Sequence, residues 1–211
     1  MPESRTAREV SSREAKRRGI LLAAIQVFAK KGYFAARMSD VAHEAGVADG
    51  TLYLYFEGKE DLLISVFDDV LNRFCVRARE EITALDDPVA KLRVLVRLHL
   101  QGLSNDRALA HILQIETRHS RRFMNVFTRG RLGEYLGLIR SVIEEGQEAG
   151  CFRRDVPPAL AINVVFGAVD ELVTSWLLAE EPTDLVRYHA PLVDLLCTGL
   201  LAQSTPGKKQ S

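Results

Sequence analysis

The sequence of 211 residues predicts an all-α fold. Apolar residues recur at the three- and four-residue spacing of amphipathic helices along most of the chain. No stretch shows the alternation of apolar and polar residues that indicates a half-buried strand. Hydrophobic residues make up 47% of the chain, which is enough for a packed core in one or two domains.

The cysteines and the N-terminus indicate the cellular compartment. Cys75, Cys151 and Cys197 are widely spaced and form no CxxC pair, which suits a reducing compartment and argues against a zinc site or a disulfide framework. The N-terminus is polar and basic without an apolar signal segment, and no uninterrupted apolar run reaches about 18 residues. We therefore expect a cytoplasmic protein without a membrane span, metal or cofactor.

The formal net charge is zero, but the N-terminal part is basic, with nine Lys and Arg against three Asp and Glu in residues 1–37. We expect a mobile arm over residues 1–12 and then a first helix that opens with a basic cluster. The cluster consists of Arg13, Lys16, Arg17 and Arg18. The helix has one apolar face, formed by Leu21, Ala24, Ile25 and Phe28. Lys30, Lys31 and Gly32 end it with a cationic last turn and a glycine stop.

Two short helices joined by a glycine-containing turn follow. Ser39 is expected to cap the first helix, and Gly46 to supply the left-handed residue that ends it. The second helix is expected over residues 51–56, ending before Gly58. Such a pair predicts a helix-turn-helix, whose second helix enters the major groove of DNA.

Two tyrosines of the second helix favour contact with DNA. Tyr53 and Tyr55 each combine an aromatic ring with a hydroxyl, and hydroxyls and lysines bind phosphate oxygens. A pair of half-buried core tyrosines is the alternative, but the neighbouring Thr51 and Lys59 favour DNA. The basic cluster, Arg17 included, is either a solvated face or a phosphate contact, and its place ahead of the helix-turn-helix favours phosphate.

The rest of the chain predicts a larger helical domain over residues 57–203 behind a head of residues 1–56, with a flexible tail at 204–211. Within this domain, Asp87 as N-cap and Pro88 as first helical residue mark the start of a new helix. Its helices are expected at about 59–84, 88–103, 107–117, 120–148, 158–177 and 185–200. Pro191 should kink the last helix or reset its start. His99 and His111 lie on or beside apolar stripes, where hydrogen-bonded core histidines are more common than metal ligands.

The last two helices are apolar over more than one face. A helix that is hydrophobic nearly all round must be covered on both sides. One side covers the core of the domain, and the other predicts a contact with a second subunit. A deeply buried helix in a monomer is the alternative.

A basic segment in the second half of the chain predicts a ligand site. Residues 118–131 contain five arginines and no acid, which is either a solvated face or a binding surface. Apolar residues and glycines lie among them, and the following helix embeds Asp170, whose carboxylate needs a partner such as Arg118. An apolar channel with a basic mouth suits a long aliphatic chain with a phosphorylated head. The candidate ligand residues are Leu103, Arg118, Arg121, Arg122, Phe123, Phe127, Phe166, Val169, Asp170 and Leu172.

The helix-turn-helix segment resembles the DNA-binding signature of the TetR family of bacterial repressors. The matching residues are Gly46, Val47, Thr51, Tyr53, Phe56, Lys59 and Leu62. The resemblance implies a homodimer in which the last two helices of each chain form a four-helix bundle. It also implies DNA-backbone contacts by Ser39, Thr51, Tyr53, Tyr55 and Lys59, with Asp49 and Gly50 facing base edges.

Three blocks, residues 47–56, 114–120 and 166–176, are similar to the fatty-acid-degradation regulator (FadR) branch of that family. This resemblance implies repression of β-oxidation genes from a palindromic operator, relieved by long-chain acyl-CoA. The chain departs from the branch in its longer basic N-terminal arm and in the composition of residues 121–131. Acyl-chain length and head-group contacts therefore stay open.

Three other functions have to be weighed. An enzyme is disfavoured, because the sequence has no G-x-S-x-G elbow, strand scaffold or glycine-rich phosphate loop. An architectural DNA-binding protein would lack a pocket in its C-terminal half. A repressor that senses another apolar compound, such as a drug or antibiotic, would have a pocket without a basic mouth.

Overall fold

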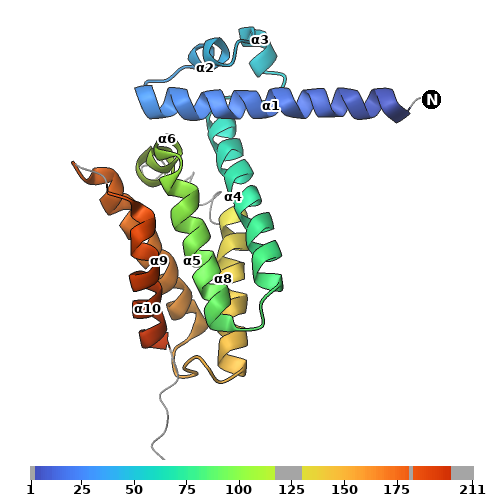
Figure 1. The fold of residues 1–211 in the computed structure, drawn as a ribbon. Helices are drawn as coiled ribbons and strands as arrows, with labels where there is room; N and C mark the ends of the chain where they lie inside the picture. Colours follow the sequence, from blue (N-terminus) through green and yellow to red (C-terminus); the bar gives the residue numbers. More distant parts are fainter. Residues whose placement is uncertain (1–2, 117–129, 181–182, 201–211) are drawn as a thin grey trace, which may run out of the picture. The chain divides into compact units, whose positions relative to one another are not determined.

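The computed structural model describes residues 3–116, 130–180 and 183–200, and in these ranges the chain forms helices joined by turns and loops (Figure 1). The predicted all-α fold is confirmed. The chain forms two compact units, the first comprising Met1–Asn72 and Asp106–Arg131, the second Arg73–Asn105 and Leu132–Ser211. The predicted head of residues 1–56 lies inside the first unit, and the functional division at residue 56 stays a prediction.

In the first unit, helix α1 lies between the helix-turn-helix and a short helix from later in the chain. The helices of this unit are α1 (Glu3–Lys31), α2 (Met38–Glu44), α3 (Asp49–Leu52), the first part of α4 (Lys59–Thr83) and α6 (Arg107–His111). Helix α1 packs against both α2 and α6. Its apolar face is buried as predicted, with Ile25 and Phe28 almost inaccessible to solvent. Gly32, at φ 76°, ends the helix.

Three sequence expectations in this unit are corrected. Residues 3–12 form the front of α1 rather than a mobile arm, because no Gly or Pro interrupts the chain between residues 3 and 18. Helix α3 starts at Asp49 and ends at Leu52 rather than covering residues 51–56. The short helix expected at 107–117 is α6 followed by a π-helical turn, η1 (Ile112–Glu116).

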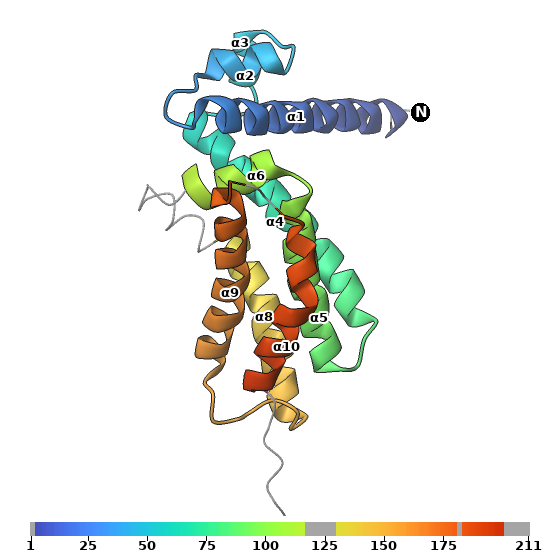
Figure 2. The ribbon, with the colours of Figure 1, turned by 60° about the vertical axis from the view of Figure 1, so that its left-hand side comes forward.

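The second unit is a bundle built from the end of α4 and the later helices (Figures 1 and 2). These are α5 (Pro88–Ser104), α8 (Arg131–Glu148), α9 (Pro158–Leu178), η3 (Leu185–Tyr188) and α10 (His189–Leu200). The predicted cap of α5 is confirmed, because the Asp87 carboxylate accepts hydrogen bonds from the amides of Val89 (3.0 Å) and Ala90 (3.2 Å). Pro191 lies in the first turn of α10, after η3, so it resets the helix start as predicted.

Helix α8 is shorter than the helix expected at 120–148. It begins at Arg131, because Gly130 lies in a turn. Residues 120–129 of the expected helix lie outside the described residues.

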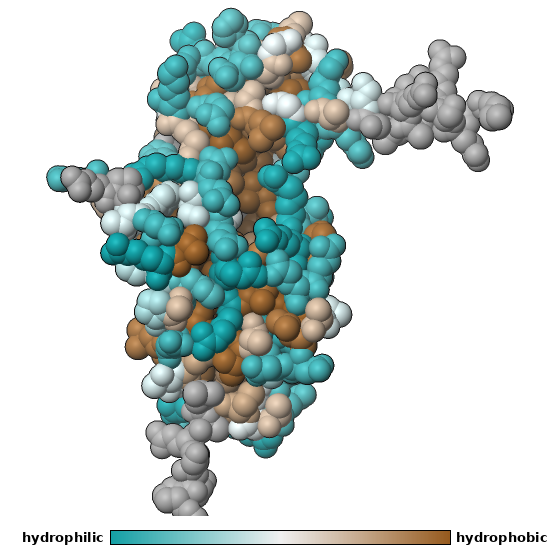
Figure 3. Space-filling view, viewed as in Figure 1, coloured by the Kyte–Doolittle hydropathy of each residue, from teal (hydrophilic) through white to brown (hydrophobic). Residues whose placement is uncertain are grey.

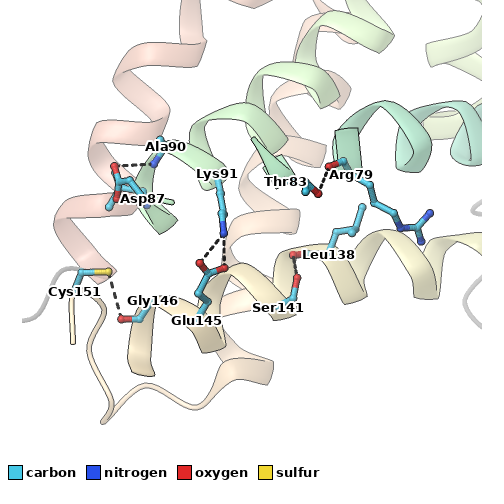
Figure 4. Close-up of polar contacts among 11 residues, drawn as sticks. Arg79, Thr83, Asp87, Ala90, Lys91, Leu138, Ser141, Glu145, Gly146 and Cys151 are labelled. Atoms are coloured by element: carbon cyan, nitrogen blue, oxygen red, sulfur yellow. Dashed lines mark hydrogen bonds and ion pairs between the residues drawn. The ribbon is translucent and has the colours of Figure 1, made fainter. Parts of the chain in front are cut away.

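Polar contacts fix the lower end of α5 against α8 (Figure 4). The Lys91 ammonium donates to both carboxylate oxygens of Glu145, at 2.6 and 2.8 Å, and Lys91 is largely buried. Arg79 forms a second ion pair across the unit, with Glu134 at 3.3 Å. The Lys91 pair is the less screened by water, so it contributes more to packing than the exposed Arg79 pair.

After α8 the chain turns back towards the last turn of the helix, where it packs against one glycine. The carbonyl of Gly146 accepts hydrogen bonds from the amides of Cys151 (3.0 Å) and Phe152 (2.9 Å) and from the Cys151 thiol (3.3 Å; Figure 4). The Phe152 ring covers the α-carbon of Gly146, and a β-carbon there would lie 2.1 Å from ring carbon Cδ2. Only glycine allows this close approach.

Helix α9 has more apolar surface than the rest of its own chain buries. Among the described helices it alone is long and apolar enough, by length and composition, to cross a membrane. It carries Asp170 and Glu171 in its middle, and a bundle helix with a second packing face passes the same test. Hydrophobic side chains of the second unit do reach the surface among hydrophilic ones (Figure 3).

We expect Gly146→Ala to destabilise the second unit. The added methyl group would overlap the buried Phe152 ring, and overpacking of this kind costs about 1–3 kcal/mol of unfolding free energy. Gly137→Ala is the matched control in the same helix, since a β-carbon at Gly137 meets nothing within 4 Å; it should stabilise by about 0.5–1 kcal/mol. Thermal unfolding of both variants checks this, and equal melting temperatures would contradict it.

Candidate functional sites

The helix-turn-helix is held by a small apolar core within the first unit. Val41 and Ala42 of α2 are buried, as are Leu52 and Phe56 around the end of α3. Gly46, at φ 66°, ends α2 as predicted. The fold therefore presents the outer side of α3 to solvent.

The cap of α2 differs from the prediction. Helix α2 begins at Met38 after the N-cap Arg37, so Ser39 is a helical residue and not the cap. The carboxylate of Asp40 instead accepts the Arg37 amide hydrogen (2.9 Å) and the Lys31 ammonium (2.7 Å). The hydrogen bond from Lys31 lowers the pKa of Asp40, so the carboxylate stays ionised at the helix N-terminus. The Asp40 carboxylate, three residues after the cap, thus provides the side-chain hydrogen bond at the start of α2 that was expected from Ser39. The side chain of Ser39 is exposed.

The residues expected to contact DNA lie along α3 and the turn that follows it. Asp49 and Gly50 form the exposed first turn of α3, where recognition helices contact base edges. Thr51 is half-buried, and Tyr53 is 58% exposed. The structure thus gathers these predicted residues on one outer surface.

Two arginines of α1 lie over the aromatic rings at the end of this surface. The guanidinium carbon of Arg13 is 5.7 Å from the centre of the Tyr55 ring, and that of Arg17 is 5.4 Å from the Phe56 ring. Both distances are within cation–π range. The sequence prediction included Arg17 but missed Arg13 as a neighbour of Tyr55; its position four residues before Arg17, on the same helix face, was the available signal.

Lys59 occupies a different place from the one expected. Its ammonium donates to the carbonyls of Tyr33 (2.7 Å), Phe34 (3.0 Å) and Ala36 (3.0 Å), and it lies 4.6 Å from the Tyr33 ring centre. A lysine has three N–H donors, and all three are used here. Burial lowers the pKa of Lys59. The side chain joins the start of α4 to the loop after α1, and a phosphate contact by Lys59 stays an untested prediction.

In the second unit, four helices meet at an aromatic cluster formed by the buried His99 and Tyr135 and the half-buried Phe74 and Phe166, from α5, α8, α4 and α9 respectively. The Phe74 and Tyr135 ring centres are 4.6 Å apart, and the Phe166 ring is 6.1 Å from His99 and 5.9 Å from Tyr135. The Nδ1 atom of His99 and the Tyr135 hydroxyl are 2.7 Å apart, within hydrogen-bonding distance. The cluster is an apolar region with one polar pair inside it.

The polar pair is uncharged. Burial lowers the pKa of His99 to about 4, against the smaller opposing effect of the Asp170 carboxylate. Burial raises the pKa of Tyr135, and Asp170 acts in the same direction. Neutral imidazole and phenol satisfy one another by a hydrogen bond, which removes the cost of burying either alone.

The predicted ligand residues are only partly placed. Leu103 and Val169 are buried, Phe166, Asp170 and Leu172 are half-buried, and Phe166 belongs to the aromatic cluster. The remaining five, Arg118, Arg121, Arg122, Phe123 and Phe127, lie outside the described residues. The sequence prediction missed Phe74 and Tyr135, because ordinary core aromatics show the same helical spacing.

The second histidine differs from the first. His99 is hydrogen-bonded as expected, but Nδ1 of His111 is buried without a hydrogen-bond partner among the described residues. Within the described ranges, no group of three or more His, Cys, Asp and Glu side chains could hold a metal ion.

The chain matches two family models. The first, described as bacterial regulatory proteins, tetR family, matches residues 20–66, and the second, YsiA-like protein, C-terminal region, matches residues 67–199. The fatty acid metabolism regulator protein of Bacillus subtilis is 35% identical over 185 residues, which are 86% of this chain and 93% of that protein.

Two solved structures are similar over most of their length. The fatty acid degradation regulator FadR from Bacillus halodurans aligns with a TM-score of 0.83 at 38% identity, over 87% of this chain and 95% of that chain. FadR from Bacillus subtilis in complex with stearoyl-CoA aligns with a TM-score of 0.83 at 34% identity, over 86% and 97%.

We expect Lys59→Ala to destabilise the first unit by about 1–2 kcal/mol, since three carbonyls lose a charged donor that is partly exposed. Lys30→Ala, which removes an exposed lysine at the end of α1, should have little effect. Thermal unfolding of the two variants checks the stability. The salt dependence of DNA binding separates the two roles of Lys59: a slope that falls by about 0.9 in Lys59→Ala would mean that it contacts a phosphate.

Proposed function

The chain belongs to the TetR family of bacterial transcriptional regulators, and on that premise we propose that it is a dimeric repressor released from a palindromic operator by long-chain acyl-CoA. The observation that carries the effector is the similarity to the Bacillus subtilis structure that holds stearoyl-CoA. A bacterial regulator of this kind acts on DNA in the cytoplasm.

In the head, one set of residues faces the bases and another set contacts the DNA backbone. Asp49 and Gly50, in the first turn of α3, face base edges and contribute to sequence reading. Arg17, Ser39, Thr51, Tyr53 and Tyr55 contact the DNA backbone. The exposed position of Tyr53 and the ring contact between Arg13 and Tyr55 support this assignment.

The dimer forms through α9 and α10. Both helices leave large apolar side chains in water, among them Leu160 and Leu178 of α9 and Leu195 of α10, exposed by 54%, 71% and 72%. Large exposed apolar side chains of this kind are typical of a protein interface. Two such pairs from two chains make a four-helix bundle, which places two heads on the two half-sites of a palindrome.

The acyl chain lies among the apolar residues predicted from the sequence. The described part of its lining comprises Leu103, Phe166, Val169 and Leu172 of the second unit, and Phe123 and Phe127, outside the described residues, are the remaining predicted members. Arg118, Arg121 or Arg122 binds the phosphates of the CoA group, and Arg118 is the candidate partner of Asp170. The contact of Phe166 with the His99–Tyr135 pair supports an apolar ligand, since neither member of this pair carries a charge.

Release requires that the ligand prefer a conformation that does not fit both half-sites. Helix α4 carries Lys59 at its first residue and Phe74 further along. A ligand that displaces the Phe74 ring acts on the helix whose first residue anchors the loop beside the helix-turn-helix. The acyl-CoA-bound form would thereby lose its fit to the operator.

Release should strengthen with acyl-chain length. A DNA duplex that the protein selects from a randomised pool serves as operator, and fluorescence anisotropy follows its release as acyl-CoAs of increasing length are added. Each buried methylene contributes about 0.8 kcal/mol, or about fourfold in affinity, until the acyl chain fills the proposed apolar channel. The free fatty acid of each length is the control and should act more weakly. No release at any length, together with release by an unrelated apolar compound, would favour the drug-sensing alternative.

We expect Leu195→Asp to give monomers that bind the operator weakly, because a carboxylate replaces an exposed leucine on α10. Leu196 is unsuitable for this test, since it is 7% exposed and its loss would unfold the chain. Leu54→Asp, at a leucine of the head that is also 72% exposed, is the matched control for oligomeric state. Sedimentation velocity measures both variants; a wild-type protein that is monomeric at micromolar concentration would refute the proposed dimer.

A further inference from the structure

We infer that the front half of α1, residues 3–18, binds the phosphates of the DNA that flanks each half-site. The inference rests on the proposed DNA-binding function and extends it to a second contact surface. That surface is defined by the exposed cations Arg13 and Lys16, together with the helical backbone ahead of them.

The first observation is the reach of this helix. Helix α1 begins at Glu3, whereas the family match begins at residue 20, so residues 3–18 lie ahead of the shared head. Both ribbon views show α1 extending well beyond α2 and α3 (Figures 1 and 2). Sixteen helical residues span about 24 Å, the length of about seven base pairs. The extension is long enough to run beside DNA outside the groove that α3 occupies.

The second observation is that, among the residues whose side chains the structure describes, the cations here have no acidic partners. Arg13, Lys16 and Arg18 make no ion pair or hydrogen bond with any residue that the structure describes. In the second unit, by contrast, cations are paired with carboxylates at short distance, such as Arg77 with Glu81 at 2.9 Å and Lys91 with Glu145 at 2.6 Å. Unpaired cations on an exposed helix are available to a polyanion.

The third observation connects the cations to the candidate DNA-binding surface. The Arg13 guanidinium lies over the Tyr55 ring, and Tyr55 follows α3 directly. Lys16, three residues later, lies on the neighbouring part of the same helix face. A duplex contacted by Tyr53 and Tyr55 would therefore meet Lys16 and Arg13 where α1 passes the end of this surface and runs on towards the flank. Charge and continuity both favour DNA over an acidic protein as the occupant.

The experiment combines a protein variant with the length of the DNA. The selected palindrome is made with no flanks and with flanks of increasing length, and affinity is measured over a range of salt concentrations. For wild-type protein, affinity and the salt slope should rise with flank length and level off near seven base pairs per side. Each phosphate contact adds about 0.9 to the slope.

The variant Lys16→Ala should bind the short palindrome nearly as wild type does and gain less from flanks than wild type does. Arg140→Ala is the control, since it removes one charge from an exposed pair of the second unit; it should keep the full gain. Circular dichroism checks that both variants fold.

The outcomes separate this inference from the proposed function. Failure of the wild-type protein to select any duplex would overturn the DNA-binding function itself. Selection of a palindrome whose affinity is the same at every flank length would overturn only the flank contact. An equal loss by Lys16→Ala on short and long duplexes would place Lys16 inside the half-site and would also overturn the flank contact.

Discussion

The arrangement of the head depends on one ammonium group. Lys59 donates to three carbonyls in the loop that follows α1, and this loop leads directly into α2. The helix-turn-helix lies between the loop and Lys59 in the chain, so the contact closes both ends of the segment. Helices α2 and α3 are too short to be stable alone. Their orientation therefore depends on this closure and on the few buried side chains beneath them, Leu52 and Phe56 among them.

In the second unit, polar groups are buried where four helices meet. His99 and Tyr135 remain uncharged and bond to each other, so they add rigidity without introducing a charge into the aromatic cluster. Charged groups lie nearer the surface, where the Lys91–Glu145 pair fixes α5 to α8. The His99–Tyr135 pair thus satisfies its own polar atoms inside an apolar environment, and the nearby Asp170 carboxylate is the charged group that acts on it.

Local signals in the sequence predicted most of the architecture. Gly32 and Gly46 end helices because their backbone conformation excludes other residues, and Asp87 followed by Pro88 specifies a helix start in a single short stretch. The predictions that failed concern residues whose positions depend on tertiary contacts. The cap of α2 depends on Lys31 holding Asp40, and the position of Lys59 depends on carbonyls far away in the sequence. The meeting of Phe74 with Tyr135 likewise needs the packing of α4 on α8, which helical periodicity does not specify.

A net charge of zero is compatible with a DNA-binding protein because the charges are sorted between the two units. Carboxylates of the second unit neutralise its cations at short range, as Glu81 does for both Arg77 and Arg97. The exposed cations at the front of α1 have no such neighbour within the described residues. The salt dependence of DNA binding therefore reports the unpaired cations of the head and not the charge of the whole chain.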